Sequence, residues 1–220
     1  MLGPAGLADG ADIMTAHGGS LENLEPLIEP SATPEESEWV NIKQFLFDLI
    51  QTIGLAVLLY LAINAMSARV RVDGLSMLPT LQNGEYVLVS KISYTFSQPK
   101  YGDIIVFKFP GETPEQDLIK RIIGVPGDVV DAVNGVIKVN GIPLSEPYIA
   151  ETPFYNGHWE VPTGMLFVLG DNRNDSSDSH AWGFVPIENV IGKAIVIYWP
   201  PPDWKLVNHL GPLATPTPLP

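Results

Sequence analysis

The chain has 220 residues and a mass of 23.9 kDa, which suits one or two domains. Its 20 glycines and 21 prolines are more than a mostly helical protein carries and are typical of turns and short strands. The absence of cysteine excludes disulfides, thiolate catalysis, zinc–thiolate sites and iron–sulfur clusters. The four histidines show no metal-ligand spacing, so we expect neither a metal nor another cofactor.

The formal charge of −13 is unevenly spread along the chain. Residues 1–42 hold eight acids and no lysine or arginine, whereas the rest of the chain holds 17 acids and 12 bases. Nucleic-acid binding is not expected, because it needs lysine and arginine gathered on one face. The composition of residues 1–43 predicts a flexible acidic tail, with at most one short helix around residues 21–28.

An apolar stretch follows the acidic tail, and its core at 45–66 reads FLFDLIQTIGLAVLLYLAINAM. A helix needs about 20 residues to cross the hydrocarbon core of a bilayer. A cleaved signal peptide fits poorly, because the stretch is preceded by acidic residues and by no basic n-region. A buried core helix is the alternative for such a sequence. We expect residues 44–67 to form a single transmembrane helix, with the lipid bilayer as its partner.

From residue 68 onward the pattern changes to short runs rich in valine, isoleucine and aromatic residues, separated by turn signals. The predicted strands are 86–91, 103–109, 118–123, 129–132, 136–139, 165–169 and 194–198. The run at 136–139 lies between two Asn-Gly pairs and suggests a hairpin. Residues 68–205 are therefore predicted to form one mainly β domain, followed by a Pro-rich tail at 206–220.

Two polar segments of this domain contain candidate site residues. Ser76 lies in the run GLSMLPTL at 74–81, soon after the apolar stretch, and a lone loop serine means little by itself. A dense polar run, GDNRNDSSDSHAWGFVP, occupies 170–186 and follows an apolar strand. Such a run is either a solvated loop or a segment whose hydrogen bonds orient catalytic groups.

Lys120 stands among apolar, strand-like residues in LIKRIIGVPGD at 118–128. Because a strand alternates its faces, Lys120 shares a face with Leu118 and Ile122, whereas Arg121 points the other way. A lysine on an apolar face loses hydration, which lowers the pKa of its amine from about 10.4 by up to several units. A neutral amine can take a proton from a serine hydroxyl. The alternative is that Lys120 reaches water and is inert.

Taken together, these segments resemble those of bacterial type I signal peptidases, also called leader peptidases, over roughly residues 43–200. Four stretches carry the resemblance in the family's order, behind one membrane anchor: GLSMLPTL at 74–81, YGDIIVF at 101–107, KRIIGVPGD at 120–128 and GDNRNDSSDS at 170–179, extended by WGFVP at 182–186. The resemblance implies a membrane-bound serine endopeptidase that removes signal peptides from exported preproteins after small-x-small sequences. It implies a β-rich domain with an antiparallel sheet and no cofactor.

The resemblance also implies a role for each matching residue. Ser76 is similar to the nucleophile, whose backbone N–H binds the oxyanion, and Lys120 is similar to the general base. Ser176 resembles the serine that hydrogen-bonds and orients the lysine amine, and Met77 resembles a contributor to the wall of the substrate pocket. Structural members of the last motif are Asp171, Asn172, Arg173 and Asp178.

Two positions depart from the family pattern. Some members carry a serine two residues before the nucleophile, which offers a hydroxyl to the oxyanion, and this chain has Gly74 there. The chain then relies mainly on the Ser76 backbone N–H, and one such donor contributes roughly 3 kcal/mol. His180 stands where the family commonly has an arginine that can pair with Asp178, so Arg173 becomes a candidate partner of that carboxylate.

The resemblance implies a single-pass protein of the cell membrane, with a cytoplasmic N-terminus and an extracytoplasmic catalytic domain, and we expect a monomer. The positive-inside rule weakly favours the reverse orientation, because Lys43 precedes the apolar stretch whereas Arg69 and Arg71 follow it. A bias of one residue is small, so we follow the resemblance.

Two other classes of protein share some of these sequence features. The first is a Ser–Lys self-cleaving regulator of the SOS-repressor type, but residues 1–44 contain no basic helix-turn-helix. The second is a catalytically inactive β scaffold tethered to the membrane, and the presence of Ser76, Lys120 and Ser176 speaks against it.

Overall fold

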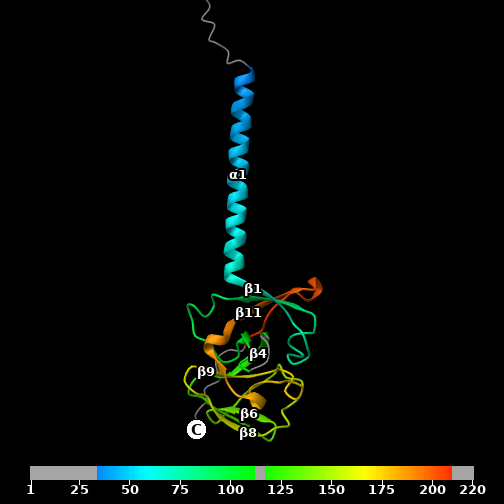
Figure 1. The fold of residues 1–220 in the computed structure, drawn as a ribbon. Coiled ribbons are helices and arrows are strands. Elements are labelled where there is room, and N and C mark those ends of the chain that lie inside the picture. Colours follow the sequence, from blue (N-terminus) through cyan, green and yellow to red (C-terminus); the bar gives the residue numbers. More distant parts are fainter. Residues whose placement is uncertain (1–33, 112–116, 210–220) are drawn as a thin grey trace, which may run out of the picture. The chain divides into compact units, whose positions relative to one another are not determined.

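The computed structural model describes residues 34–111 and 117–209 of the chain (Figure 1). The N-terminal part is one α-helix, α1, which spans Pro34–Met66. Within it, Asn41–Met66 is apolar enough to cross a bilayer, with a mean hydropathy of 2.1, and no part of its most apolar stretch is buried. A helix that is apolar all round and unburied in its own protein is suited to lipid, which argues against the alternative of a buried core helix.

The helix begins ten residues before the predicted transmembrane segment at 44–67. Residues 35–43 contain no glycine or proline, and a helix that is already nucleated extends readily into such residues. The last part of the predicted flexible tail is therefore helical. The rest of that tail, including the short helix expected around residues 21–28, lies outside the described residues.

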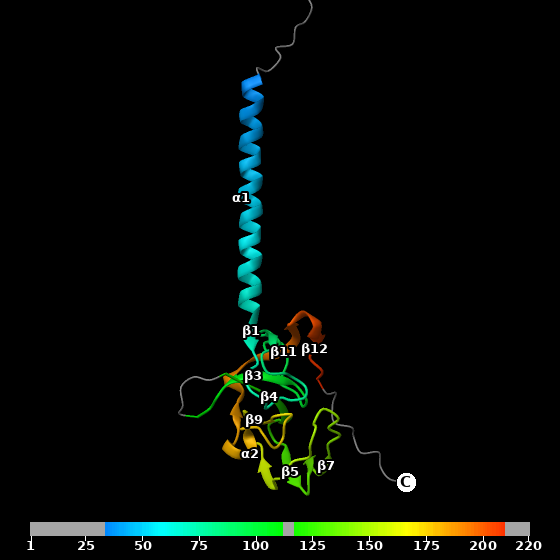
Figure 2. The same cartoon turned by 90° about the vertical axis from the view of Figure 1, so that its right-hand side faces the viewer.

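The remainder of the described chain forms two antiparallel sheets (Figures 1 and 2). The larger sheet has the order β1-β2-β11-β3-β4-β9-β10, with β12 paired to β11. Its strands are β1 (Ser67–Arg71), β2 (Tyr86–Ser90), β3 (Ile104–Lys108), β4 (Asp117–Gly124), β9 (Met165–Leu169), β10 (Val185–Pro186), β11 (Val190–Trp199) and β12 (Lys205–Leu206). The smaller sheet, at the end of the domain away from β1 in both views, has the order β7-β6-β5-β8. Its strands are β5 (Val129–Val133), β6 (Val136–Val139), β7 (Ile142–Pro143) and β8 (Gly157–Glu160).

Short helices connect some of these strands: α2 (Ser179–Trp182), and the 3₁₀ turns η1 (Ile187–Asn189) and η2 (Pro201–Asp203). The mainly β, antiparallel fold expected from the sequence is confirmed, and each predicted strand coincides with an observed one. The hairpin expected around 136–139 is also present. Asn134 and Gly135 connect β5 to β6, and both have positive φ, as a two-residue turn between twisted strands requires.

Strand β4 lies where three parts of the hydrophobic core meet. Ile119 packs in the hydrophobic cluster with residues of β1, β2 and β11. Ile123 packs in the cluster that the larger sheet shares with the smaller sheet. Ile122 packs in the third cluster, with residues of β3 and β9. The strand is also hydrogen-bonded on both edges, to β3 and to β9. Lys120 and Arg121 between these isoleucines are therefore held on one of the most constrained strands of the domain.

The folded domain extends beyond the predicted boundary at residue 205. Leu206 pairs with Val196 of β11, Val207 is buried in the core, and the ring of His209 accepts a hydrogen bond from the backbone N–H of Ile104 (3.2 Å). Residues 206–209, expected to belong to the Pro-rich tail, therefore belong to the folded domain. The rest of that tail, residues 210–220, lies outside the described residues.

Candidate active site

The side chains of Ser76 and Lys120 meet, although 44 residues separate them in the sequence. Ser76 lies in the loop of residues 72–85 between β1 and β2, called the serine loop below, and Lys120 lies on β4. The Lys120 Nζ donates a hydrogen bond of 2.7 Å to the Ser76 Oγ. When the amine is neutral, the same contact lets the hydroxyl donate to the nitrogen lone pair. A proton can therefore pass directly between the two groups.

Burial of Lys120 favours the neutral amine. The side chain is 3% exposed, and this loss of hydration lowers the pKa of its amine from the ordinary value of 10.5 to about 8. Asp178 and Asp171 act in the opposite direction, because their negative charges favour the ammonium form. Desolvation is the larger effect, so the amine loses its proton close to neutral pH.

The loop of residues 170–178, called the acidic loop below, holds the serine loop in place. The backbone N–H of Asn172 donates to the backbone oxygen of Ser76 (3.0 Å), and the Asn172 side-chain amide donates to the backbone oxygen of Leu75 (3.2 Å). The hydroxyl of Thr80 donates to the Asp171 carboxylate. Asp171 and Asn172, expected to be structural members of their motif, thus contact the segment that carries the serine.

Arg121 points away from Lys120, as strand alternation predicts. Its guanidinium forms two hydrogen bonds with the Asp171 carboxylate, of 2.8 and 2.7 Å, and both side chains are buried. It also donates to the backbone oxygen of Gly102 and lies 4.0 Å from the ring centre of Tyr148. Removing one partner of such a buried pair costs about 3–5 kcal/mol, so this pair fixes the acidic loop to β4.

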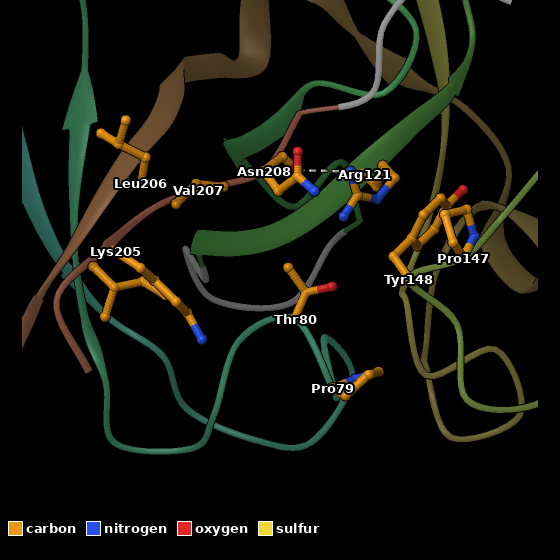
Figure 3. Close-up of a pocket in the computed structure, with 10 residues that line it drawn as sticks. Pro79, Thr80, Arg121, Pro147, Tyr148, Lys205, Leu206, Val207 and Asn208 are labelled. Atoms are coloured by element: carbon orange, nitrogen blue, oxygen red, sulfur yellow. Dashed lines mark hydrogen bonds between the residues drawn. The ribbon is translucent and has the colours of Figure 1, made fainter. Parts of the chain in front are cut away.

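Arg121 lines a pocket of about 330 Å³, and Figure 3 shows the residues around it. The dashed line marks the contact of Arg121 with Asn208, whose backbone oxygen accepts a hydrogen bond of 3.3 Å. This contact joins the C-terminal segment to β4, and Thr80 and Tyr148 line the same pocket. The pocket therefore lies on the side of β4 opposite to Lys120.

The structure corrects the expected partner of Arg173. Its guanidinium pairs with the Glu146 carboxylate, at 2.5 and 2.9 Å, and not with Asp178. Asp178 instead accepts hydrogen bonds from the backbone N–H of Gly170 (2.9 Å) and contacts the His180 ring Nδ1 (2.6 Å). The sequence contains no local sign of the first pairing, because 27 residues separate its partners.

Ser176 differs from expectation in its hydrogen bonding. Its Oγ is buried and has no hydrogen-bond partner in the described part of the chain, so the expected bond to the Lys120 amine is not formed in this structure. The hydroxyl instead packs against Gly170, which also lies against the backbone oxygen of Ser76. A side chain larger than hydrogen at position 170 would meet both groups.

A cleft of about 590 Å³ opens at Ser76 and Lys120. Its lining residues are Asp73, Gly74, Leu75, Ser76, Phe109, Leu118, Lys120, Asp175 and Ser177. The sequence could have identified Leu118 as a cleft residue, because strand alternation places it on the same face as Lys120. Nothing in the sequence identifies Phe109 as a residue of the cleft. Met77, expected in the wall of the substrate pocket, is 1% exposed and packs in the hydrophobic core instead.

Gly74 lies two residues before Ser76 and has no side chain that could donate a hydrogen bond to a substrate. Gly74 is exposed with a φ of 107°, and its own N–H donates to the Asn83 side chain (2.9 Å). Within the described residues, the Ser76 N–H donates no backbone hydrogen bond. The residues described also contain no group of three or more histidine, aspartate or glutamate side chains that could hold a metal.

The site has a serine hydroxyl in contact with a buried lysine amine, at the wall of a cleft in an antiparallel β domain. This is the arrangement of a serine hydrolase that uses lysine as its base. The family model described as "Signal peptidase, peptidase S26" matches residues 46–199. The chain therefore belongs to the signal peptidase I family, peptidase S26, whose members are serine endopeptidases that remove signal peptides.

Individual relatives agree with this assignment. The chain is 42% identical over 212 residues to a Signal peptidase I of Leptolyngbya laminosa, a match that covers 92% of this chain and 98% of the relative. It is 42% identical over 180 residues to a Probable signal peptidase I-1 of Synechocystis sp., covering 78% and 90% of the two chains. It is 40% identical over 148 residues to the Thylakoidal processing peptidase 1, chloroplastic, of Arabidopsis thaliana, covering 63% and 44%.

Proposed function

We propose that Ser76 is the nucleophile and Lys120 the general base of this signal peptidase. The neutral Lys120 amine takes the proton of the Ser76 hydroxyl as the Oγ attacks the scissile carbonyl carbon. The resulting ammonium then gives the proton to the leaving amine, which departs as the N-terminus of the mature protein. Lys120 next takes a proton from a water molecule, whose oxygen attacks the acyl-enzyme ester. As the bond from the acyl carbon to the Ser76 Oγ breaks, the Lys120 ammonium returns the proton to this Oγ, and the signal peptide leaves as a carboxylic acid that ionises in water. The observation that carries the proposal is the 2.7 Å contact between these two side chains inside the cleft.

The oxyanion is assigned to the backbone N–H of Ser76. This donor lies on the attacking residue itself, and it has no backbone acceptor among the described residues. One oxyanion donor contributes roughly 3 kcal/mol to the stability of the transition state. Gly74 offers no hydroxyl to add to it.

The substrate is assigned as a signal peptide cut after a small-x-small sequence. An extended peptide can pair with exposed strand backbone near Ser76, which presents alternate side chains to the enzyme. Shallow pockets for the residues one and three before the cut accept alanine, glycine or serine and reject larger side chains by sterics. Efficient cleavage of peptides with leucine or phenylalanine at the position before the cut would contradict this specificity.

The membrane arrangement is assigned from the one long apolar helix among the described residues, and its orientation from the resemblance to the family. Asn41–Met66 crosses the cell membrane once, with the acidic N-terminal residues in the cytoplasm and residues 70–220 outside, and the enzyme acts as a monomer. One relative is a thylakoidal enzyme, so the thylakoid membrane is the alternative location. Protease added to intact spheroplasts should digest the β domain and spare the acidic tail; digestion of the tail alone would reverse the orientation.

The mechanism is tested by preprotein cleavage with the purified full-length protein in detergent. Ser76→Ala and Lys120→Arg should both abolish cleavage, the second because a guanidinium stays protonated at every working pH. Ser145→Ala and Lys138→Arg are matched controls, because Ser145 is exposed and Lys138 lies on β6 of the smaller sheet. Near-normal turnover of Lys120→Arg at alkaline pH would make Lys120 a structural cation, and the proposed pair would be wrong.

A further inference from the structure

One residue of the acidic loop binds the backbone on both sides of the proposed nucleophile. The side-chain amide of Asn172 donates to the backbone oxygen of Leu75 (3.2 Å), and its backbone N–H donates to the backbone oxygen of Ser76 (3.0 Å). These two carbonyls belong to the peptide groups before and after the Ser76 Cα. Asn172 therefore fixes both of the peptide planes that meet at this residue.

The peptide group between Leu75 and Ser76 contains the N–H that is proposed as the oxyanion donor. A trans peptide group is planar, and its N–H points in the direction opposite to its C=O. The Leu75 oxygen accepts from the Asn172 side chain and also from the backbone N–H of Leu78 (3.1 Å), so two donors set its direction. The Ser76 N–H consequently points away from the Asn172 amide, within a segment that lines the cleft.

The same contacts make this N–H a stronger donor. Hydrogen bonds accepted by the carbonyl end of a peptide group polarise the group, which increases the positive charge on its N–H. Among the described residues, the Ser76 N–H donates no backbone hydrogen bond that a substrate oxygen would have to replace. Gly74 has no hydroxyl that could compensate for a misdirected N–H.

We infer that Asn172 is a positioning residue for the reaction: its side-chain amide orients the Ser76 N–H and thereby stabilises the oxyanion of the transition state. The inference rests on the proposed roles of Ser76 as nucleophile and oxyanion donor. The negative oxygen exists only while the carbonyl is attacked, so loss of this contact should lower kcat and leave KM unchanged. A residue that only maintains the fold would not separate the two constants in this way.

A second asparagine of the acidic loop provides a matched control. The side chain of Asn174 is exposed, donates to the backbone oxygen of Thr152 (3.0 Å) and accepts from the backbone N–H of Phe154 (2.9 Å). Its hydrogen bonds therefore join the acidic loop to residues 151–154 and not to the serine loop. Asn174→Ala removes contacts of the same chemical type from the same loop.

The first experiment is steady-state cleavage of a preprotein by the full-length protein in detergent. Asn172→Ala should lower kcat by about fivefold, the effect of one lost hydrogen bond on a rate, with KM unchanged. Asn172→Asp keeps the shape of the side chain, but its ionised carboxylate cannot donate, so it should lose at least as much and replaces the alanine variant if that folds poorly. Asn174→Ala should keep the kcat of the wild type.

The second experiment measures binding of the oxyanion itself. In a signal-peptide aldehyde that ends at the cut position, the carbonyl carbon forms a bond to the Ser76 Oγ, and the carbonyl oxygen becomes the hemiacetal oxygen and takes up the hydroxyl proton. The corresponding peptide alcohol has no carbonyl and measures binding without attack. The ratio of the alcohol's inhibition constant to that of the aldehyde should fall in Asn172→Ala by the same factor as kcat, and should not change in Asn174→Ala.

Several results would overturn the inference. They are an unchanged kcat in both Asn172 variants, a loss confined to KM, an unchanged ratio of inhibition constants, or an equal loss of kcat in Asn174→Ala. Failure of the proposed nucleophile is a separate result, because Ser76→Ala would then still bind the aldehyde in preference to the alcohol as strongly as the wild type does.

Discussion

Replacement of Lys120 by methionine should stabilise the protein while it abolishes the activity. Methionine has an unbranched side chain of similar length, so it can fill the space of the lysine among apolar residues without the charge. Burial lowers the pKa of Lys120 from 10.5 to about 8, which means that the folded state binds this proton less well than the unfolded state does. The difference corresponds to a cost of about 3 kcal/mol to folding stability.

The pH dependence of this gain has a definite sign. Below pH 8 the lysine is charged in both the folded and the unfolded state, and the whole cost is present. Between about pH 8 and 10.5 the unfolded state binds more protons, so the stability of the wild-type protein rises with pH. The advantage of Lys120→Met should therefore be about 3 kcal/mol at pH 7 and should vanish near pH 10.5.

The measurement is urea-induced unfolding of the full-length protein in detergent micelles, followed by tryptophan fluorescence at pH 7, 9 and 10.5. Lys138→Met serves as the control, because Lys138 is a partly exposed lysine on β6, and no comparable gain is expected. Equal unfolding free energies for Lys120→Met and the wild type at pH 7 would refute the claim that folding bears the cost of desolvating this lysine. A gain that persists unchanged at pH 10.5 would assign it to packing instead of charge.

Two further substitutions test how the loops hold the site. Gly170→Ala should lower kcat/KM at least tenfold and reduce stability, because an added Cβ would overlap the Ser176 side chain and the backbone oxygen of Ser76. If activity and unfolding midpoint stay close to those of the wild type, the loops move apart at little cost. Thr80→Val should lower the unfolding free energy by about 1 kcal/mol, because valine keeps the shape of threonine but loses the hydrogen bond from the Thr80 hydroxyl to the Asp171 carboxylate. An unchanged free energy in urea unfolding would mean that this hydrogen bond does not contribute to stability.

The features that local patterns determine were predictable from the sequence. Apolar runs between turn signals located seven of the strands, and alternation along β4 placed Lys120 and Arg121 on opposite faces, as observed. The predicted ranges do not include β1, β7, β8, β10 or β12, which are short or contain polar residues, as the sequences SARVR, GHWE and KL show. These short strands form because neighbouring strands pair with them, which is a tertiary effect.

The partners of the charged residues could not be predicted. Arg173 and Asp178 are only five residues apart, so the sequence favoured a pairing between these two. The fold instead brings Glu146 to Arg173 and leaves Asp178 to His180. Sequence spacing gives the chemical types available at a site, whereas the choice among several acids and bases depends on which side chains the strands bring within reach.

The place of β11 in the larger sheet has a consequence for the synthesis of the enzyme. The strand pair β1–β2, whose connecting loop carries Ser76, and the pair β3–β4, which carries Lys120, are joined in the sheet only through β11. Because β11 spans Val190–Trp199, a ribosome has made both hairpins and all residues up to β11 before the two halves can be joined. A nascent or truncated chain that lacks this strand has the proposed nucleophile and base on separate hairpins. The order of synthesis thus delays the assembly of the proposed catalytic pair until β11 has been made.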